Sequence, residues 1–159
     1  MTTKNKPKAS PAVAKDLLSG FLETLQQGFE TDTNLETSAG VEFDYGRYGT
    51  FILRRAIHRN AAYSKAFKEK ILPHIQSRVG SEDDNDDEVV EQKMSAIYAE
   101  TVIIGLKTAD GQTIPYDAEA KKAIAKLFIS APDLFAKIKA DASDAANFRK
   151  KKTEAEAKN

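Results

Sequence analysis

The sequence contains no cysteine and no tryptophan, and only two histidines, His58 and His74, among its 159 residues. Disulfides and thiol chemistry are therefore excluded, which fits a reducing compartment. The two histidines lack the i, i+4 spacing of a helical zinc pair. Catalysis by side chains needs an activated nucleophile, or a metal with suitably spaced ligands. We therefore expect no enzyme activity, no catalytic residue, no metal site and no cofactor.

Long apolar runs and net charge are missing as well. The most apolar stretch, residues 94–106, is interrupted by Glu100 and is shorter than the ~20 residues that a transmembrane helix needs. Residues 1–10 lack the apolar run of a signal peptide. The 24 basic and 24 acidic residues cancel, so no global field attracts the chain to nucleic acid or to an anionic membrane. We expect a soluble cytoplasmic protein that does not bind a membrane.

A local case for nucleic-acid binding rests on basic and aromatic residues. A basic cluster covers residues 149–152, two arginines stand at 54–55, and Tyr45, Arg47 and Tyr48 could stack on bases. Neutralising phosphates needs a continuous positive face, which zero net charge and an acidic run oppose. A small nucleic-acid-binding module is therefore a lesser alternative to a protein that binds other proteins.

The acidic run within residues 80–88 is the strongest candidate for a metal loop. Asp83, Asn85 and Asp87 stand at alternating positions as the ligands of an EF-hand loop do, but that loop also needs glycine at position six and glutamate at position twelve. Counted from Asp83, these positions hold Glu88 and Met94. We interpret the run as a solvated acidic loop.

Helical periodicity accounts for most of the chain. Residues 11–29 carry apolar side chains at intervals of four, which predicts a core helix, with a docking helix as the alternative. Pro73 ends or kinks the helix that contains it. Four further helices are expected: from Asn60 to near Leu72, from about Asp87 to Gly105 or Leu106, over 117–128, and over 130–148.

A β-hairpin is expected between the first two helices. Residues 41–45 alternate apolar and acidic side chains, residues 46–49 supply a glycine-rich turn, and residues 50–53 resume the apolar run. The predicted fold is therefore mainly α (α+β minor), a small helical domain of about five helices with one β-hairpin. It covers residues 11–148, between a disordered arm at 1–10 and a charged tail at 149–159.

Residues 98–148 organise the domain through a series of tight junctions. Asp110-Gly111 predicts a sharp reversal, because glycine adopts positive φ without steric cost. Ile114–Tyr116 is held extended by its proline, and Asp117 caps the next helix. Ser130 is a plausible N-cap, and Pro132 is tolerated in the first helical turn.

The same stretch carries a family resemblance. In order along the chain, its motifs are Tyr98–Leu106, Asp110-Gly111, Ile114–Tyr116, Pro132–Phe135 and Asn147-Phe148. Together they resemble the tail assembly chaperones of long-tailed bacteriophages, and residues 41–73 are similar as well. One departure is Leu106, where relatives commonly have tryptophan after the glycine.

This resemblance implies a chaperone that escorts the long, largely helical and aggregation-prone tape measure protein while tail tube subunits polymerise around it. It implies action in the host cytoplasm and absence from the mature virion, and a homo-oligomer is compatible with it. Exposed apolar or aromatic anchors would bind the partner, and a core role is the alternative for each. The candidates on motif positions are Tyr116, Leu134, Phe135 and Phe148. The alternative function is a structural tail or head-tail component.

Relatives of this type often produce a longer form by a ribosomal frameshift, and the added segment recruits the tail tube protein. Residues 157–159 can be encoded by GCA AAA AAC, which contains a heptamer suited to backward slippage, and residues 149–151 could encode another. We expect the coding DNA to contain such a heptamer with an overlapping frame downstream. Unslippery codons at both places would contradict this expectation.

Overall fold

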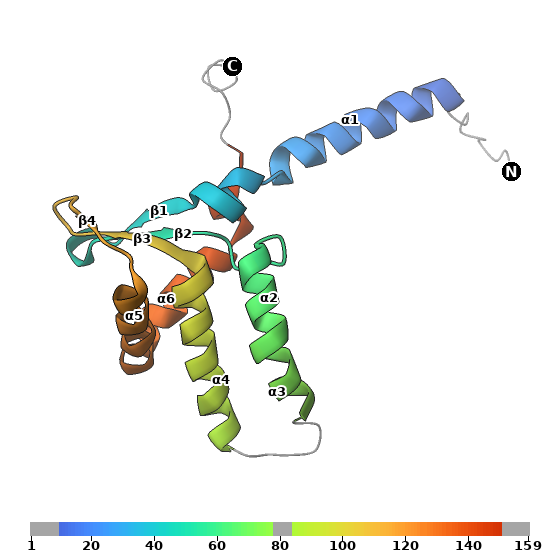
Figure 1. Cartoon of the computed structure of the whole chain (residues 1–159). Helices are drawn as coiled ribbons and strands as arrows, with labels where there is room; N and C mark the ends of the chain where they lie inside the picture. The colour runs from blue at the N-terminus through green and yellow to red at the C-terminus, as the bar shows by residue number, and fades with distance from the viewer. Residues whose placement is uncertain (1–9, 78–83, 151–159) are drawn as a thin grey trace, which may run out of the picture. The chain divides into compact units, whose positions relative to one another are not determined.

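The computed structural model describes residues 10–77 and 84–150 (Figure 1). The expected disordered arm, apart from Ser10, therefore lies outside the described residues. So do the first part of the acidic loop and the charged tail beyond Lys150, which includes residues 157–159. The chain divides into two compact units, residues 1–30 and residues 31–159. Each unit is described by itself.

The first unit contains one helix, α1 (Pro11–Phe29). Ser10 caps its N-terminus by accepting a hydrogen bond from the backbone N–H of Val13 at 3.4 Å, and Pro11 occupies the first turn. Within its own unit no residue of α1 is buried, so the expectation that this helix belongs to the core stays a prediction. The apolar periodicity was read correctly, but periodicity identifies a face without identifying what covers it.

The second unit is built on a four-stranded antiparallel sheet in the order β1-β2-β3-β4. The expected hairpin is present as β1 (Val41–Asp44) and β2 (Thr50–Leu53), joined by a short 3₁₀ turn, Gly46–Tyr48. Gly49 has φ +92°, and a Cβ there would lie 2.4 Å from the carbonyl oxygen of Lys107, so this turn requires glycine. Two further strands, β3 (Ile103–Lys107) and β4 (Thr113-Ile114), extend the hairpin into a sheet.

Strand β3 overturns one expected helix. The helix predicted to reach Gly105 or Leu106 is α4 (Asp84–Ile97), which ends in a π-helical turn, η3 (Tyr98–Val102). The chain then becomes extended and pairs with β2, Phe51 opposite Leu106 and Ile52 opposite Gly105. The β-branched residues before Gly105 favour a strand. Strand β2 supplies the hydrogen-bonding edge for it, and the prediction of a helix here did not take this edge into account.

The junctions after β3 follow the local signals with one exception. The reversal between β3 and β4 has Gly111 at φ +88°, and Asp117 caps α5 (Ala118–Ser130) by accepting from the N–H of Ala120 at 2.9 Å. Pro132 begins α6 (Pro132–Ser143), but the N-cap is Ala131, which makes no side-chain bond. The hydroxyl of Ser130 donates instead to the carbonyl of Leu127, so Ser130 ends α5 and does not cap α6. The last expected helix is also divided, since Asp144 caps a separate 3₁₀ turn, η4 (Ala145–Phe148).

Asn60 joins α2 (Ala61–Lys70) to the end of α4. Its side chain accepts from the N–H of Tyr63 and donates to the carbonyl of Thr101 at 3.1 Å, although only 2% of Asn60 is exposed. A short helix, α3 (Leu72–Ser77), follows α2 and has Pro73 in its first turn, where proline is tolerated.

Side chains from one face of the sheet and from the helices form the core. Phe51, Leu53 and Leu106 from the sheet meet Phe128 on α5 and Phe135 on α6. The described part of the chain thus has six α-helices and one small antiparallel sheet, which confirms the mainly α fold class. Among the described residues, no helix combines the length and the hydropathy needed to span a membrane.

Candidate partner-binding surfaces

Two of the four expected contact residues lie in the core. The side chain of Phe135 is 0% exposed, with its ring stacked on Phe128 at 4.7 Å and edge-on to Tyr98 at 5.3 Å between centroids. Phe148 is also 0% exposed and lies 6.3 Å from the ring of Phe43. In this structure neither side chain can contact a partner directly, because both are buried. Each can influence a surface only through the side chains that pack on it.

The other two expected residues are partly exposed. Tyr116 and Leu134 both pack against the core cluster that contains Phe135. The structure therefore gathers three of the four residues around one core cluster. The sequence interpretation had all four as candidates for rimming one surface, with a core role as the alternative for each.

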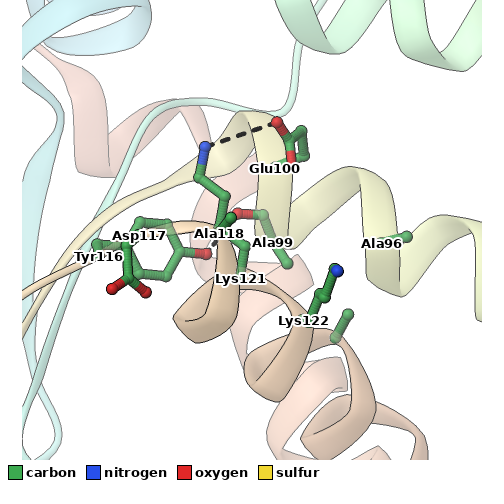
Figure 2. A pocket seen from close by; sticks show the side chains of 9 residues that line it. Ala96, Ala99, Glu100, Tyr116, Asp117, Ala118, Lys121 and Lys122 are labelled. Atoms are coloured by element: carbon green, nitrogen blue, oxygen red, sulfur yellow. Dashed lines mark hydrogen bonds and ion pairs between the residues drawn. The ribbon is translucent and has the colours of Figure 1, made fainter.

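Tyr116 forms one wall of a shallow cleft between α5 and the end of α4 (Figure 2). Its hydroxyl donates a hydrogen bond to the carbonyl oxygen of Ala99. The Nζ of Lys121 lies 3.5 Å from a carboxylate oxygen of Glu100 and 6.0 Å from the centre of the Tyr116 ring. The cleft encloses about 260 Å³, and its other lining side chains are Ala96, Asp117, Ala118, Lys122 and Ala125.

Tyr116 is a neutral hydrogen-bond donor in the cleft. Burial, aided by the negative charge of Glu100, raises the pKa of Tyr116 well above its usual value of 10.0. The phenol therefore stays protonated and keeps its hydrogen bond to Ala99. Besides Tyr116, the lining consists of alanines and charged side chains, so the cleft can accept a small apolar side chain.

The largest exposed apolar surface among the described residues lies on α1. We call it the α1 stripe, and its exposed fractions run from 40% to 65%. Its members are Val13, Leu17, Leu18, Phe21, Leu22 and Leu25. Since an α-helix turns about 100° per residue, these side chains cover about half of its circumference. At ~30 Å² for each apolar carbon, scaled by the exposed fractions, the six side chains present roughly 450 Å² of apolar surface.

The opposite side of α1 is polar and weakly charged. Within the helix it carries one basic residue, Lys15, and two acidic residues, Asp16 and Glu23. Helices that lie in a membrane interface have a polar face rich in lysine and arginine. The composition of α1 therefore favours a protein as the partner of the stripe.

A buried ion cluster, which the sequence interpretation missed, holds the start of the second unit. The carboxylate of Glu36 is 0% exposed and accepts from Arg55 Nη1 at 2.7 Å, Arg59 Nη1 at 3.2 Å and Thr31 Oγ1 at 2.6 Å. Burial alone would raise the pKa of Glu36, but the bonds from Thr31 and Arg55 and the two positive charges outweigh it and lower the pKa. The cluster fixes the segment after α1 to the end of β2.

Three of the residues considered for nucleic-acid binding are engaged in contacts within the protein. Arg55 is committed to Glu36, and Arg54 Nε donates to the carbonyl of Ser38 at 3.2 Å. Tyr45 donates to Asp141 Oδ2 at 2.7 Å and packs on Phe51, so its ring is not available for stacking on bases. Among the residues that the structure describes, no group of three or more acidic or histidine side chains is placed to hold a metal ion.

Taken together, the described residues form a mainly helical unit with a small antiparallel sheet, preceded by an amphipathic helix whose apolar face is open. The family model of the YdaY prophage protein matches residues 58–159, more than half of the chain. The chain therefore belongs to the YdaY prophage protein family and is phage-derived. No curated protein and no solved structure matches it. The matched range includes residues 98–148, and α1 lies outside it.

Proposed function

We propose that this chain is a tail assembly chaperone of a long-tailed phage. It binds the tape measure protein, keeps it soluble, and helps to recruit tail tube subunits, through a frameshifted long form, during tail morphogenesis. It acts in the host cytoplasm and leaves the tail before the virion is complete. Membership of a prophage family and the succession of motifs over residues 98–148 support this role.

The observation that carries the proposal is the open α1 stripe. A long helical client exposes apolar faces along its length before the tube encloses it. The stripe offers a matching apolar face on a helix, and helices pack through such faces by interlocking side chains. Lys15, Asp16 and Glu23 lie outside the stripe, where they keep a complex soluble. This role requires no catalytic residue, metal or cofactor.

The residues on the motif positions have different parts in this proposal. Tyr116, at the cleft, and Leu134 are the two that a client can reach, because both are partly exposed. Phe135 and Phe148 maintain the unit that carries them, because both are fully buried.

Co-expression of the chain with the tape measure protein of the same phage tests the proposal. We expect soluble tape measure protein that co-elutes with the chain on a sizing column. The double variant Leu17→Glu, Phe21→Glu should abolish co-elution, because each change removes about 1.5–3 kcal/mol of apolar burial. The matched control Ser19→Glu, Gln26→Glu adds the same charge to the polar side of α1 and should behave as the wild type.

Three results would contradict parts of the proposal. If the tape measure protein stays insoluble with the wild type, even when the long form is supplied, the chaperone role is wrong. If the stripe variant solubilises it as well as the control does, another surface binds the client. Recovery of the chain from purified virions would favour the structural tail component.

A further inference from the structure

The α1 stripe has no cover within its own unit. Its helix contains two glycines, Gly20 and Gly28, each of which costs about 1 kcal/mol relative to alanine inside a helix. Isolated helices shorter than ~12–15 residues are marginal in water, and most helical stability in proteins comes from packing of an apolar face. With 19 residues and two glycines, α1 is only slightly above that limit. None of the residues of α1 is buried. A partner that covers the stripe would supply the missing stabilisation.

We propose that other copies of this chain provide the cover, and that the chain self-associates through α1. Each copy presents roughly 450 Å² of apolar surface, more than half of the ~800 Å² that one partner buries in a standard-size interface. Copies carry the same stripe, so every stripe meets a surface of equal length and equal apolar character. No other component is needed, and the inference concerns the chain without any client.

The width of the stripe indicates the form of the assembly. A two-stranded coiled coil uses a narrow seam of two positions in seven. The stripe covers about half of the helix, from Val13 through Leu17 and Phe21 to Leu22. One partner helix would leave an edge of it in water. A bundle of three or more α1 helices covers both edges and leaves Lys15, Ser19 and Glu23 facing solvent.

Self-association and client binding would then use the same face. In the free protein the stripes cover one another, which prevents unspecific aggregation of an exposed apolar surface. A tape measure helix would replace the neighbouring copies. This coupling rests on the proposed function, whereas self-association itself does not.

Light scattering on a sizing column, with the full chain and no client, tests the inference. We expect an oligomer of the 17.5 kDa chain that dissociates on dilution. The variant Leu17→Glu, Phe21→Glu should weaken association by about a hundredfold or more and elute as a monomer. The control Ser19→Glu, Gln26→Glu should keep the wild-type mass.

Circular dichroism provides a second measurement on the same samples. If copies stabilise α1, helix content should fall on dilution for the wild type and should be low at every concentration for the stripe variant. The thermal transition of the second unit should be unchanged in the variant, since the substituted side chains are exposed. A wild-type chain that is monomeric at all concentrations, or an oligomer that the stripe variant leaves intact, would overturn the inference.

Discussion

Replacing Phe135 by alanine is expected to lower the free energy of unfolding of the second unit by about 3–5 kcal/mol. The ring is fully buried, stacks on Phe128 at 4.7 Å, meets Tyr98 edge-on, and has Lys139 Nζ 4.3 Å from its centre. Alanine would remove all these contacts and leave a cavity between α5, α6 and η3. Against a total stability of ~5–15 kcal/mol for an ordinary domain, this loss is large.

Urea denaturation followed by circular dichroism measures the effect. The matched control is Phe21→Ala, the same substitution at a ring that is 61% exposed on α1, and it should leave the midpoint of the second unit unchanged. Equal midpoints for Phe135→Ala and the wild type would mean that the ring is not part of the core. The prediction also limits the use of Phe135→Ala in binding experiments, because a lost interaction would then report unfolding.

Replacing Glu36 by alanine is expected to cost about 3 kcal/mol, the lower end of the range for breaking a buried ion pair. The carboxylate is fully buried, whereas the side chain of Arg55 keeps 15% of its surface exposed and that of Arg59 keeps 52%. The loss comes mainly from Arg55, which would stay largely buried without its counter-charge. Arg59 can turn to water.

The variant Glu36→Gln separates charge from shape, since it keeps an oxygen that Thr31 can donate to while it removes the negative charge. We expect its stability at neutral pH to lie between those of the wild type and Glu36→Ala. If Glu36→Ala unfolds at the same urea concentration as the wild type, the ion cluster does not stabilise the fold.

The lowered pKa of Glu36 also predicts a dependence on pH. A carboxyl group whose pKa is lower in the folded chain than in the unfolded chain stabilises the fold fully above the unfolded pKa, near its ordinary value of 4.5. That stabilisation is lost as pH falls through the folded pKa. Between neutral and acidic pH, the wild type should therefore lose more stability than Glu36→Gln, as measured by urea denaturation across this range.

Most signals that act within a few residues were read correctly from the sequence, and Ser130, which does not cap α6, is an exception. Asn60 and Asp117 cap their helices, Gly111 supplies the positive φ of a reversal, and Pro132 begins α6. Each of these features depends on the backbone of its immediate neighbours, so the local sequence contains nearly all the information needed.

Features that depend on distant partners were not predicted. Ile103–Lys107 continues an apolar helical pattern, and it becomes β3 because β2, some fifty residues earlier in the chain, pairs with it. Glu36 lies in a polar segment, and its partner Arg55 is 19 residues further on. Neither pairing produces a periodic pattern in the sequence from which it could be predicted.

The sequence by itself determined the helical character of the chain, its caps and turns, and the existence of the α1 stripe, because these follow from local backbone preferences and from a 3.6-residue period. Only the tertiary structure decided which apolar faces are buried. Phe135 and Phe21 both lie on amphipathic helices, yet one is enclosed by Phe128 and Tyr98 while the other is open. The physical reason is that burial depends on the surfaces that meet a side chain, and those surfaces come from residues far away in the sequence or from another molecule.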